Sequence, residues 1–591
     1  MVRYATLGFT CLGLNCYNMY RNGAAGSYSG RGGDTCQHIH KGGLVSRKRL
    51  DFLGLLAAFW AASTADAAIN VGLATPMDKV MIKGISNGWL FEGWLDDHYD
   101  LSLARNEHEA FQVAVWSSQA LSNVNVSVSA LQKVGGGSFN GTVQVSLVGH
   151  VDVSDDPMDN LNITYPPYLV DYTGWWPDPI LTFQQTCNIN ANDRVAFWID
   201  VASRSDTSAG DYTGTVTVSA SGETPVTLTL NVKVWDFALP ATPSFPTAFS
   251  CQMNKVSPVY GSLYGTYNIE QQFWDMHLAH RLSVTHLYQN FPDPMSEINY
   301  WFARGETIFN ASKVPTSNDA ALASLYNTFA SQGRLNQLYV YGYDEITSDK
   351  YQAMHDTFTA IHTAYPGLRT MTTAYDDSFG TSPGTAFLRD AVDIWVPGPT
   401  KYNIAQADAL RAEGKDMWWY VAMSPKHPYP NYFIEYPGIE PRLFMGAMPF
   451  KYKVGGCLHY AIANWNFGTS SGLITSGPYT NWDPRTVYSD SSHGWVDGDG
   501  SFYCPGPTGP IPTTRLENIR DGLEDYEYLA LLKSIARTVN RCPTAPEQQT
   551  FVSEANALLA IPSSVMTSVT SYTRNPADLY NFRQQVAQKI I

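Results

Sequence analysis

The hydrophobic and polar positions change their spacing twice along the chain. Between residues 68 and 240, short segments alternate or run apolar and are separated by Gly, Asn and Ser turns. These segments span residues 101–104, 111–116, 124–131, 143–151, 194–201, 212–220 and 224–235. Short strands with such turns are typical of a β-sandwich. We expect a β-sandwich domain over residues 68–240, in which the charged stretch 105–109 is a polar turn or an interdomain contact.

After the Pro-rich stretch 239–244, strand-like and helix-like segments alternate. Candidate strands span residues 247–251, 284–288, 338–343, 369–375, 393–396, 417–423, 456–465 and, more weakly, 501–503. Helical stretches fall near residues 269–281, 319–332, 350–364, 404–413 and 441–451. Such alternation predicts a parallel sheet, and eight strands fit a TIM-like (β/α)8 barrel over residues 245–540. A doubly wound sheet is the alternative, but no Gly-rich phosphate fingerprint follows the first strand.

The clearest helix begins at Thr514. The pattern Thr514-x-x-Glu517 predicts a capping box, and apolar residues then repeat at helical spacing. We expect most of the acids Asp521, Glu524, Asp525 and Glu527 to form a solvated helix face. Residues 541–591 are expected to be a C-terminal helical segment.

The first 67 residues resemble an N-terminal extension followed by a secretory signal. Three basic residues at 47–49 precede the apolar run 52–62, and Ala-Asp-Ala follows at 65–67. The apolar run is short for a membrane span, although a single membrane anchor is the alternative. We expect a secreted or extracytoplasmic protein cleaved after Ala67, with membrane contact only through the signal or such an anchor.

The composition narrows the class of partner. The chain is 44% hydrophobic, 13% aromatic and only 15% charged, with a net charge of -15. The negative charge argues against nucleic acids and anionic membranes, while abundant Trp and Tyr suit a carbohydrate-handling protein. Five cysteines lie beyond residue 67, and their spacing shows no zinc pattern. Residues 497–500, Asp-Gly-Asp-Gly, are expected to form a tight turn rather than a calcium loop. We expect no metal and no cofactor.

The candidate chemistry lies after the strand 338–343, where Asp344 and Glu345 follow at once. Carboxylates at the C-terminal end of a strand occupy the position of the active site in α/β barrels. Desolvation and mutual repulsion are expected to raise the pKa of one of them, which would make it a general acid. The alternative is an ordinary pair of surface acids that caps the next helix.

Several stretches resemble glycoside hydrolase family 123 and the broader group that shares its catalytic domain. They are residues 341–345, residues 418–420 with Arg442 and 456–460, the long run 515–528, and residues 234–237 before Leu239-Pro240. The resemblance covers residues 68 to about 540. It implies a sandwich followed by a (β/α)8 barrel, and an exo-β-N-acetylgalactosaminidase with a retaining, substrate-assisted mechanism. The implied substrate is a glycan or glycosphingolipid that ends in β-linked N-acetylgalactosamine.

The resemblance also implies a role for each acid. The 2-acetamido oxygen of the sugar attacks the anomeric carbon; Glu345 protonates the leaving oxygen, and Asp344 orients the acetamido group and supports the developing charge. Such substrate assistance is an exception to the usual two-carboxylate scheme. Adjacent strand residues point to opposite faces, so the backbone must leave strand geometry near Asp344.

The expected substrate-binding residues lie at or near other strand ends, with packing or loop capping as their alternative role. They are Tyr343, Tyr375, Asp376, Trp419, Tyr420, Asn464 and Trp465. Two other functions stay open. One is a glycosidase of different specificity with a carboxylate nucleophile such as Asp376, and the other is a non-catalytic carbohydrate-binding surface protein.

Overall fold

The computed structural model describes residues 68–84, 96–153, 172, 174–290, 292–314, 319–465, 472–487, 495–541 and 545–591. The expected extension and signal over residues 1–67 lies outside the described residues. Within the described ranges, no helix combines the length and the apolar character that crossing a membrane requires.

Two β-sheets form the N-terminal region. The first is antiparallel and has the order β1 (Asn70–Ala74), β3 (His108–Trp116), β9 (Arg194–Ala202), β6 (Thr142–Asp152) and β7 (Trp175–Leu181). The second has the order β2 (His98–Arg105), β11 (Val226–Ala238), β10 (Gly210–Ser219), β4 (Leu121–Val128) and β8 (Thr186–Ile189), with β5 (Gln132–Lys133) beside β10. Only the pair β2–β11 is parallel in this sheet.

The two sheets pack face to face, as the alternating pattern predicts. Tyr99 of the second sheet stacks on Phe111 of the first, with ring centroids 4.4 Å apart. All seven expected strands are present, and β1, β5, β7 and β8 are additional. Strand β7 contains Pro177 and Pro179, which mask it in the sequence; it lies at the edge of its sheet, where proline is tolerated.

Parallel strands form the α/β region in two sheets. One has the order β13 (Val284–Thr285), β12 (Thr247–Ser250), β20 (Cys457–His459) and β19 (Trp419–Tyr420). The other has the order β14 (Phe309–Val314), β15 (Leu338–Gly342), β16 (Arg369–Thr372), β17 (Ile394–Trp395) and β18 (Asp416–Met417). The expected strand at 501–503 is no part of either, because β23 (Tyr503–Pro505) pairs antiparallel with β24 (Pro510–Pro512).

The strand hydrogen bonds give two sheets rather than the single closed sheet expected from the sequence. The segment 416–420 joins them on one side, since its β18 pairs with β17 and its β19 pairs with β20. On the other side, the described residues of β13 and β14 form no ladder. There the side chain of Asn310 donates to the carbonyl of His286 (2.9 Å) and accepts from the amide of Tyr341 (2.8 Å). Strand β14 was not expected, because its buried polar residues Asn310 and Ser312 break the apolar pattern.

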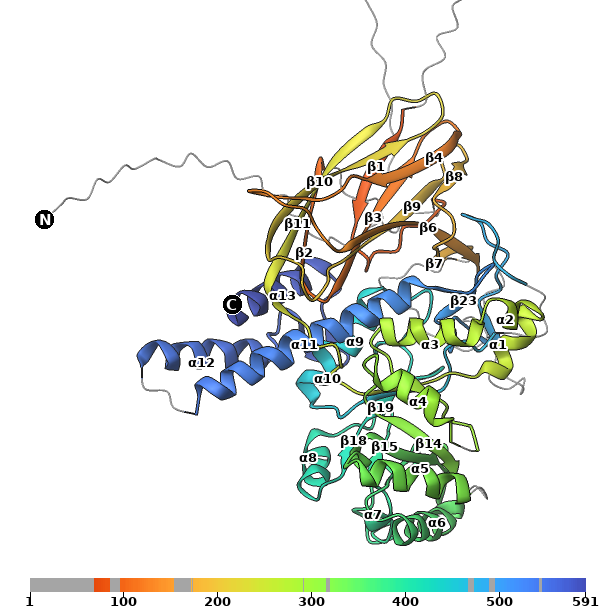
Figure 1. Ribbon diagram of the computed structural model, residues 1–591, viewed down its shortest axis with the longest axis vertical. Helices are drawn as coiled ribbons and strands as arrows, with labels where there is room; N and C mark the ends of the chain where they lie inside the picture. The colour runs from red at the N-terminus through yellow and green to blue at the C-terminus, as the bar shows by residue number, and fades with distance from the viewer. Residues whose placement is uncertain are drawn as a thin grey trace, which may run out of the picture. The chain divides into compact units, whose positions relative to one another are not determined.

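The parallel strands sort their side chains between two apolar clusters. On β15, Tyr339 and Tyr341 join an inner cluster, whereas Leu338 and Val340 pack toward the surrounding helices. The inner cluster draws on both sheets and contains Ala248, Leu287, Ile308, Tyr339, Tyr341, Met371, Ile394, Val396, Trp418 and Leu458. The helices in this region (Figure 1) are α1 (Met253–Tyr260), α2 (Leu263–Thr266), α3 (Ile269–Ala279), α4 (Met295–Phe302), α5 (Asp319–Ser331), α6 (Tyr351–Ala364), α7 (Leu388–Ala391), α8 (Ile404–Ala412), α9 (Ile439–Met445) and α10 (Ala447–Tyr452).

The long helix α11 (Thr514–Val539) begins at the predicted residue, but the residue that caps it is not the predicted one. Its N-cap is Thr513, whose hydroxyl accepts from the amide of Leu516 at 3.2 Å. Glu517 is 3.1 Å from the ring of His280 and 2.6 Å from Arg520, so it closes no capping box. After α11 come α12 (Pro546–Leu559), a hairpin of β25 (Met566–Ser568) and β26 (Ser571–Tyr572), and α13 (Pro576–Ile590).

The acids of α11 are buried, which overturns the expected solvated face. Arg442 of α9 is 1% exposed and contacts three carboxylates: Glu109 of β3 at 3.0 Å, Asp521 at 3.3 Å and Asp525 at 2.7 Å. Glu524 pairs with Arg281, and Glu527 accepts from Ser244. Because Glu109 lies in the stretch 105–109, that stretch is an interdomain contact. Arg583 of α13 extends the network to Glu107 and Asp525.

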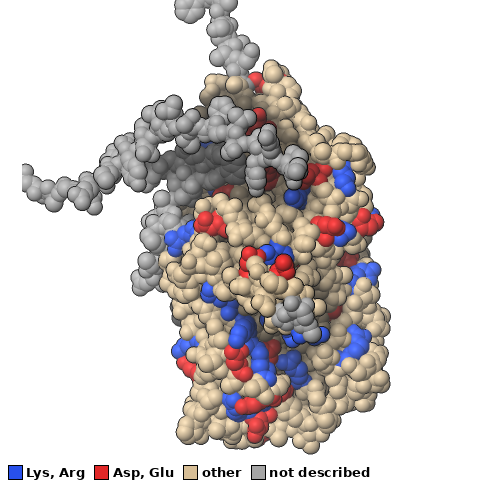
Figure 2. All heavy atoms as spheres, turned by 90° about the vertical axis from the view of Figure 1, so that its left-hand side faces the viewer, with Lys and Arg blue, Asp and Glu red and all other residues tan. Residues whose placement is uncertain are grey.

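The face of the molecule drawn in Figure 2 carries few charges, in keeping with the 15% of charged residues in the sequence. In Figure 2, blue and red residues lie in small groups of mixed sign among wide uncharged areas.

Candidate active site

The acid pair lies in a strained turn directly after β15. The strand ends at Gly342, and the next residues include two with a left-handed backbone: φ is +56° at Tyr343 and +50° at Glu345. A side chain at position 342 would collide with the carbonyl of Val314 on the neighbouring strand. Residues other than glycine adopt this conformation only where surrounding contacts hold it, and such positions gather at functional sites. The turn takes both acids out of strand alternation, so both Asp344 and Glu345 line the same cleft.

Asp344 is held by two hydroxyl groups. Its Oδ1 accepts hydrogen bonds from Tyr341 of β15 and from Thr373, the latter at 2.7 Å. The two hydroxyls are themselves 3.1 Å apart. Both donors reach one oxygen, which fixes the orientation of the carboxylate.

Glu345 has different partners. Its Oε1 accepts from the hydroxyl of Tyr420 at 2.5 Å, and its backbone amide donates to the hydroxyl of Thr373 at 3.0 Å. Burial and the negative charge of Glu345 raise the pKa of Tyr375 to about 12 and that of Tyr420 well above its ordinary value. Both phenols therefore stay protonated at neutral pH and are available as donors beside Glu345.

The cleft has a volume of about 820 Å³ and opens at the C-terminal ends of the parallel strands. Tyr288 after β13, Thr373 after β16, Tyr420 of β19 and Tyr460 after β20 all line it together with the acid pair. Burial, together with the charges of Asp344 and Glu345, raises the pKa of Tyr288 far above its ordinary value. The cleft thus combines two exposed acids with aromatic and hydroxyl groups, an arrangement suited to binding a sugar.

Three of the predicted binding residues line this cleft: Tyr375, Tyr420 and Asp376. Tyr375 is 52% exposed and is available for stacking. Asp376 uses one carboxylate oxygen for the amide and hydroxyl of Ser378 and the other for the amide of Gly380. Its carboxylate therefore stabilises the loop that follows β16.

The other four predicted binding residues do not line the cleft. Trp419 is fully buried and stacks on Phe444, and Trp465 is buried and donates to the carbonyl of Tyr503. The hydroxyl of Tyr343 is 2.9 Å from the carbonyl of Ala353 on α6. Asn464 contacts the cleft only indirectly: its side-chain amide donates at 3.3 Å to the hydroxyl of Tyr460, which lines the cleft.

Sequence reasoning missed Tyr288, Tyr460 and Thr373. Tyr288 is the last residue of the expected strand 284–288, so the rule that selected Tyr375 could have selected it. Thr373 lies inside the expected strand 369–375, which in the structure ends at Thr372. No local pattern marks a threonine as a partner of both acids.

Replacing Tyr375 and Trp419 separately tests this division of roles. Trp419→Ala should destabilise the protein by about 3–5 kcal/mol, the usual cost of deleting a buried aromatic ring. Tyr375→Ala should leave the denaturation midpoint nearly unchanged and raise KM, because its exposed ring packs little against the protein. Urea denaturation and steady-state kinetics measure the two effects; a stable Trp419→Ala variant with a raised KM would contradict the assignment.

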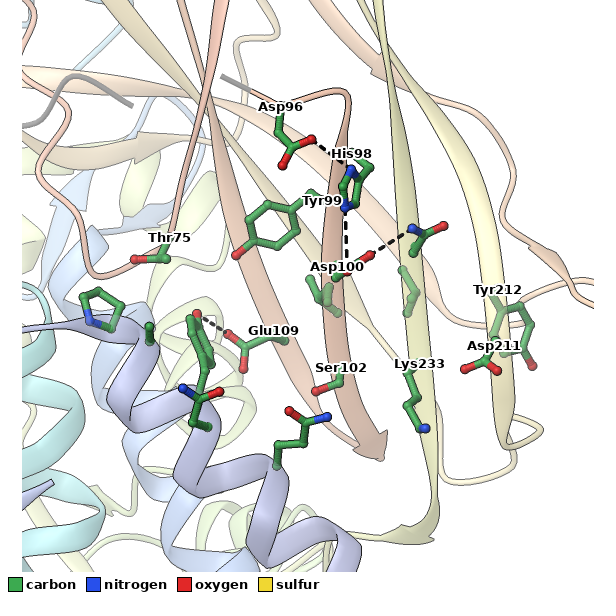
Figure 3. A pocket seen from close by; sticks show the side chains of 18 of the residues that line it. Thr75, Asp96, His98, Tyr99, Asp100, Ser102, Glu109, Asp211, Tyr212 and Lys233 are labelled. Carbon is green, nitrogen blue, oxygen red and sulfur yellow. Dashed lines mark hydrogen bonds and ion pairs between the residues drawn. The ribbon is translucent and has the colours of Figure 1, made fainter. Parts of the chain in front are cut away.

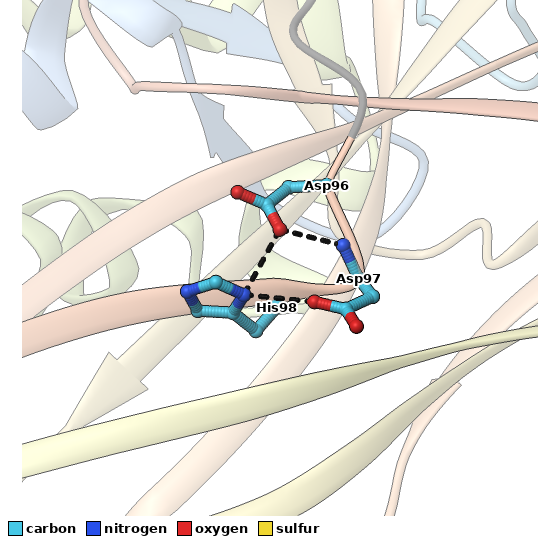
Figure 4. Close-up of side chains that lie close together, drawn as sticks. All are labelled: Asp96, Asp97 and His98. Carbon is cyan, nitrogen blue, oxygen red and sulfur yellow. Dashed lines mark hydrogen bonds and ion pairs between the residues drawn. The ribbon is translucent and has the colours of Figure 1, made fainter. Parts of the chain in front are cut away.

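A larger pocket, of about 940 Å³, lies elsewhere (Figure 3), between β2, β10, β11 and α13. Asp96 and His98 line this pocket, and with the neighbouring Asp97 they bring their ligand atoms within 4.8 Å of one another (Figure 4). Among the described residues, this is the group of three side chains that could hold a metal ion. All three side chains are exposed. They belong to the sandwich, whereas the acid pair belongs to the α/β region.

Two family models match the chain. The one described as "Glycoside hydrolase 123, catalytic domain" matches residues 312–532, and "Glycoside hydrolase 123 N-terminal domain" matches residues 96–220. Together they cover more than half of the chain. No curated protein sequence matches it.

Among solved structures, a family 123 glycoside hydrolase from Clostridium perfringens matches with a TM-score of 0.62 at 14% identity, over 88% of this chain and 97% of that one. A family 39 glycoside hydrolase from Bacteroides cellulosilyticus WH2 matches with a TM-score of 0.27 at 10% identity, over 68% of this chain and 80% of that one. The second TM-score is too low to support any conclusion.

The α/β region, its paired acids and these matches define a glycoside hydrolase. The chain belongs to glycoside hydrolase family 123.

Proposed function

We propose that the protein is an exo-β-N-acetylgalactosaminidase that retains anomeric configuration by substrate assistance. The observation that carries this proposal is the turn after β15, which directs two adjacent acids into one cleft and gives each its own hydroxyl partners. A pair of adjacent acids can reach two neighbouring positions on one sugar, the glycosidic oxygen and the 2-acetamido group.

In this proposal Glu345 is the general acid and then the general base. Tyr420 donates to Oε1 and leaves Oε2 to carry the proton to the leaving oxygen. The sugar's acetamido oxygen attacks the anomeric carbon as the glycosidic bond breaks, giving an oxazolinium intermediate. Glu345 then takes a proton from the water that opens this ring.

Asp344 has the complementary role. Tyr341 and Thr373 hold its Oδ1, so Oδ2 is the oxygen that accepts the acetamido N–H. The negative charge beside the forming ring stabilises the positive charge that develops there.

We further infer that the two parallel sheets form one distorted (β/α)8 barrel. Segment 416–420 contributes a strand to each sheet. The inner apolar cluster contains residues that lie on, or directly beside, the parallel strands of both sheets. The side chain of Asn310 bridges the remaining seam between β13 and β14.

The similarity to the C. perfringens enzyme, whose description concerns glycolipid glycan hydrolysis, supports a proposal for the substrate class. We propose glycans or glycosphingolipids that end in β-linked N-acetylgalactosamine.

A panel of aryl glycosides tests the specificity. The β-N-acetylgalactosaminide should be hydrolysed faster than the β-N-acetylglucosaminide, and the β-galactoside, which lacks the acetamido group, should be inert. Hydrolysis of the β-galactoside would exclude substrate assistance. Binding of glycans without hydrolysis of any substrate would favour a carbohydrate-binding protein, which the intact acid pair argues against.

The rival glycosidase mechanism uses Asp376 as a covalent nucleophile. Because its carboxylate oxygens bind Ser378 and Gly380, the loop geometry disfavours this role. A thiazoline that mimics the oxazoline should inhibit strongly. A trapped covalent sugar without thiazoline inhibition would support the rival.

We also propose export, supported by the signal-like pattern at residues 47–67. N-terminal sequencing of protein collected outside the cell should begin at Ala68; a start at Met1 would contradict cleavage.

A further inference from the structure

We propose that Thr373 is a positioning residue that holds both acids in register through a single hydroxyl group. Its Oγ1 lies 2.7 Å from Oδ1 of Asp344 and 3.0 Å from the backbone amide of Glu345. It is also 3.1 Å from the hydroxyl of Tyr341, the other partner of Asp344. The inference rests on the proposed function, and it assigns Thr373 a role that is exerted through the two acids.

The placement of Thr373 follows from β16. Side chains alternate along a strand, and Met371 of β16 joins the inner apolar cluster. Thr373 is two residues after Met371, so its side chain points to the same side of the sheet. Its hydroxyl therefore reaches Asp344 and Glu345 in the turn that follows β15. The residue is only 2% exposed, so water competes little for its hydrogen bonds.

The hydroxyl has the right capacity for this task. A threonine hydroxyl offers one donor and two acceptor positions. The hydroxyl of Thr373 donates a hydrogen bond to Asp344, and its oxygen accepts a hydrogen bond from the backbone amide of Glu345. The first bond orients a carboxylate, and the second holds Glu345 at its left-handed backbone angle of +50°. Loss of the hydroxyl therefore releases both acids together, although neither is changed chemically.

Thr373→Val removes the hydroxyl and keeps the shape. Its kcat should fall about 10²-fold, the effect of a small misplacement of reacting groups, with a smaller change in KM. The loss should remain with a dinitrophenyl leaving group, because Asp344 stays misplaced even when no proton is needed. Thr373→Ser retains the hydroxyl and should recover most of the activity.

Thr370→Val is the matched control. Thr370 is fully buried on the same strand, and its hydroxyl donates to the carbonyl of Ala391, away from the acids. This variant should lose similar stability in urea denaturation while keeping wild-type kcat per folded molecule.

A double-mutant cycle distinguishes positioning from a general structural role. If Thr373 acts through Asp344, the double variant Asp344→Asn/Thr373→Val should lose far less than the product of the two single losses. Multiplicative losses, wild-type kcat in Thr373→Val, or a Thr373→Ser variant no better than Thr373→Val would each overturn the proposal.

The cycle is measured on whichever aryl glycoside the wild-type enzyme hydrolyses best. If that is not an N-acetylhexosaminide, the proposed specificity fails, while the coupling between Thr373 and Asp344 is still measured.

Discussion

Glu345→Gln and Asp344→Asn should each lower the rate on a substrate with a poor leaving group by about 10²-fold or more, the scale of general acid catalysis. Glu345→Gln removes the transferable proton. Asp344→Asn keeps the shape but removes the charge that supports the oxazolinium ion.

The two variants should differ when the leaving group is an acidic dinitrophenolate. That substrate needs little protonation, so Glu345→Gln should recover much of its rate of glycosidic bond cleavage. Asp344→Asn should not recover, because ring formation still requires the acetamido group to be held and its charge balanced. Pre-steady-state release of dinitrophenolate measures this first step directly.

Asp377→Asn is the matched control, since this exposed acid lines the same cleft but pairs with Lys401. It should retain near wild-type activity. Rescue of Asp344→Asn instead of Glu345→Gln would reverse the proposed roles. Full activity in both variants would show that this pair is not the active site.

The second large effect concerns stability. Arg442→Met should destabilise the protein by about 3–5 kcal/mol, because it leaves Glu109, Asp521 and Asp525 buried without their shared cation. Arg389→Met, which breaks a more exposed pair with Glu413, should change the urea midpoint little.

The loss in Arg442→Met should depend on pH. Burial alone would raise the pKa of Glu109, but Arg442 and Arg583 outweigh it, so the pKa is lowered from 4.5. Because the pKa of Glu109 is lower in the folded protein than in the unfolded chain, its ionised form stabilises the fold at pH values above the unfolded-state pKa. This stabilisation is lost as the pH falls through the folded-state pKa. The difference in stability between wild type and Arg442→Met should therefore be fully present well above pH 4.5, the ordinary pKa of a glutamate, and should shrink as the pH falls below it. A pH-independent difference would indicate lost packing rather than lost charge pairing.

The features that the sequence predicted well are local. The strand before Asp344 shows its apolar character within six residues, and the seven expected sandwich strands show their alternation in the same way. The acid pair follows such a strand, so its place at a strand end could be predicted without any tertiary information.

The features that the sequence did not predict depend on partners far away in the chain, or on which of two neighbouring strand residues points into the core. Trp418 points into the inner cluster and Trp419 away from it, and the sequence contains no signal for which of two adjacent tryptophans faces inward. The acids of α11 look solvated until Arg442 and Arg281 are placed beside them. Likewise, Asn310 resembles a loop residue because its partners are distant in the sequence: Tyr341 lies on β15, and His286 directly follows β13.

The pairing of Arg583 with Glu107 has a consequence for biosynthesis. The two residues are 476 positions apart, and they join helix α13 to the turn between β2 and β3 of the sandwich. During synthesis the sandwich leaves the ribosome before Arg442 and Arg583, the cations that pair with Glu107 and Glu109. The two glutamates therefore stay without these partners until nearly the whole polypeptide has been made. Removal of α13 alone should therefore destabilise the N-terminal sandwich. A nascent chain stalled before residue 576 should remain dependent on chaperones.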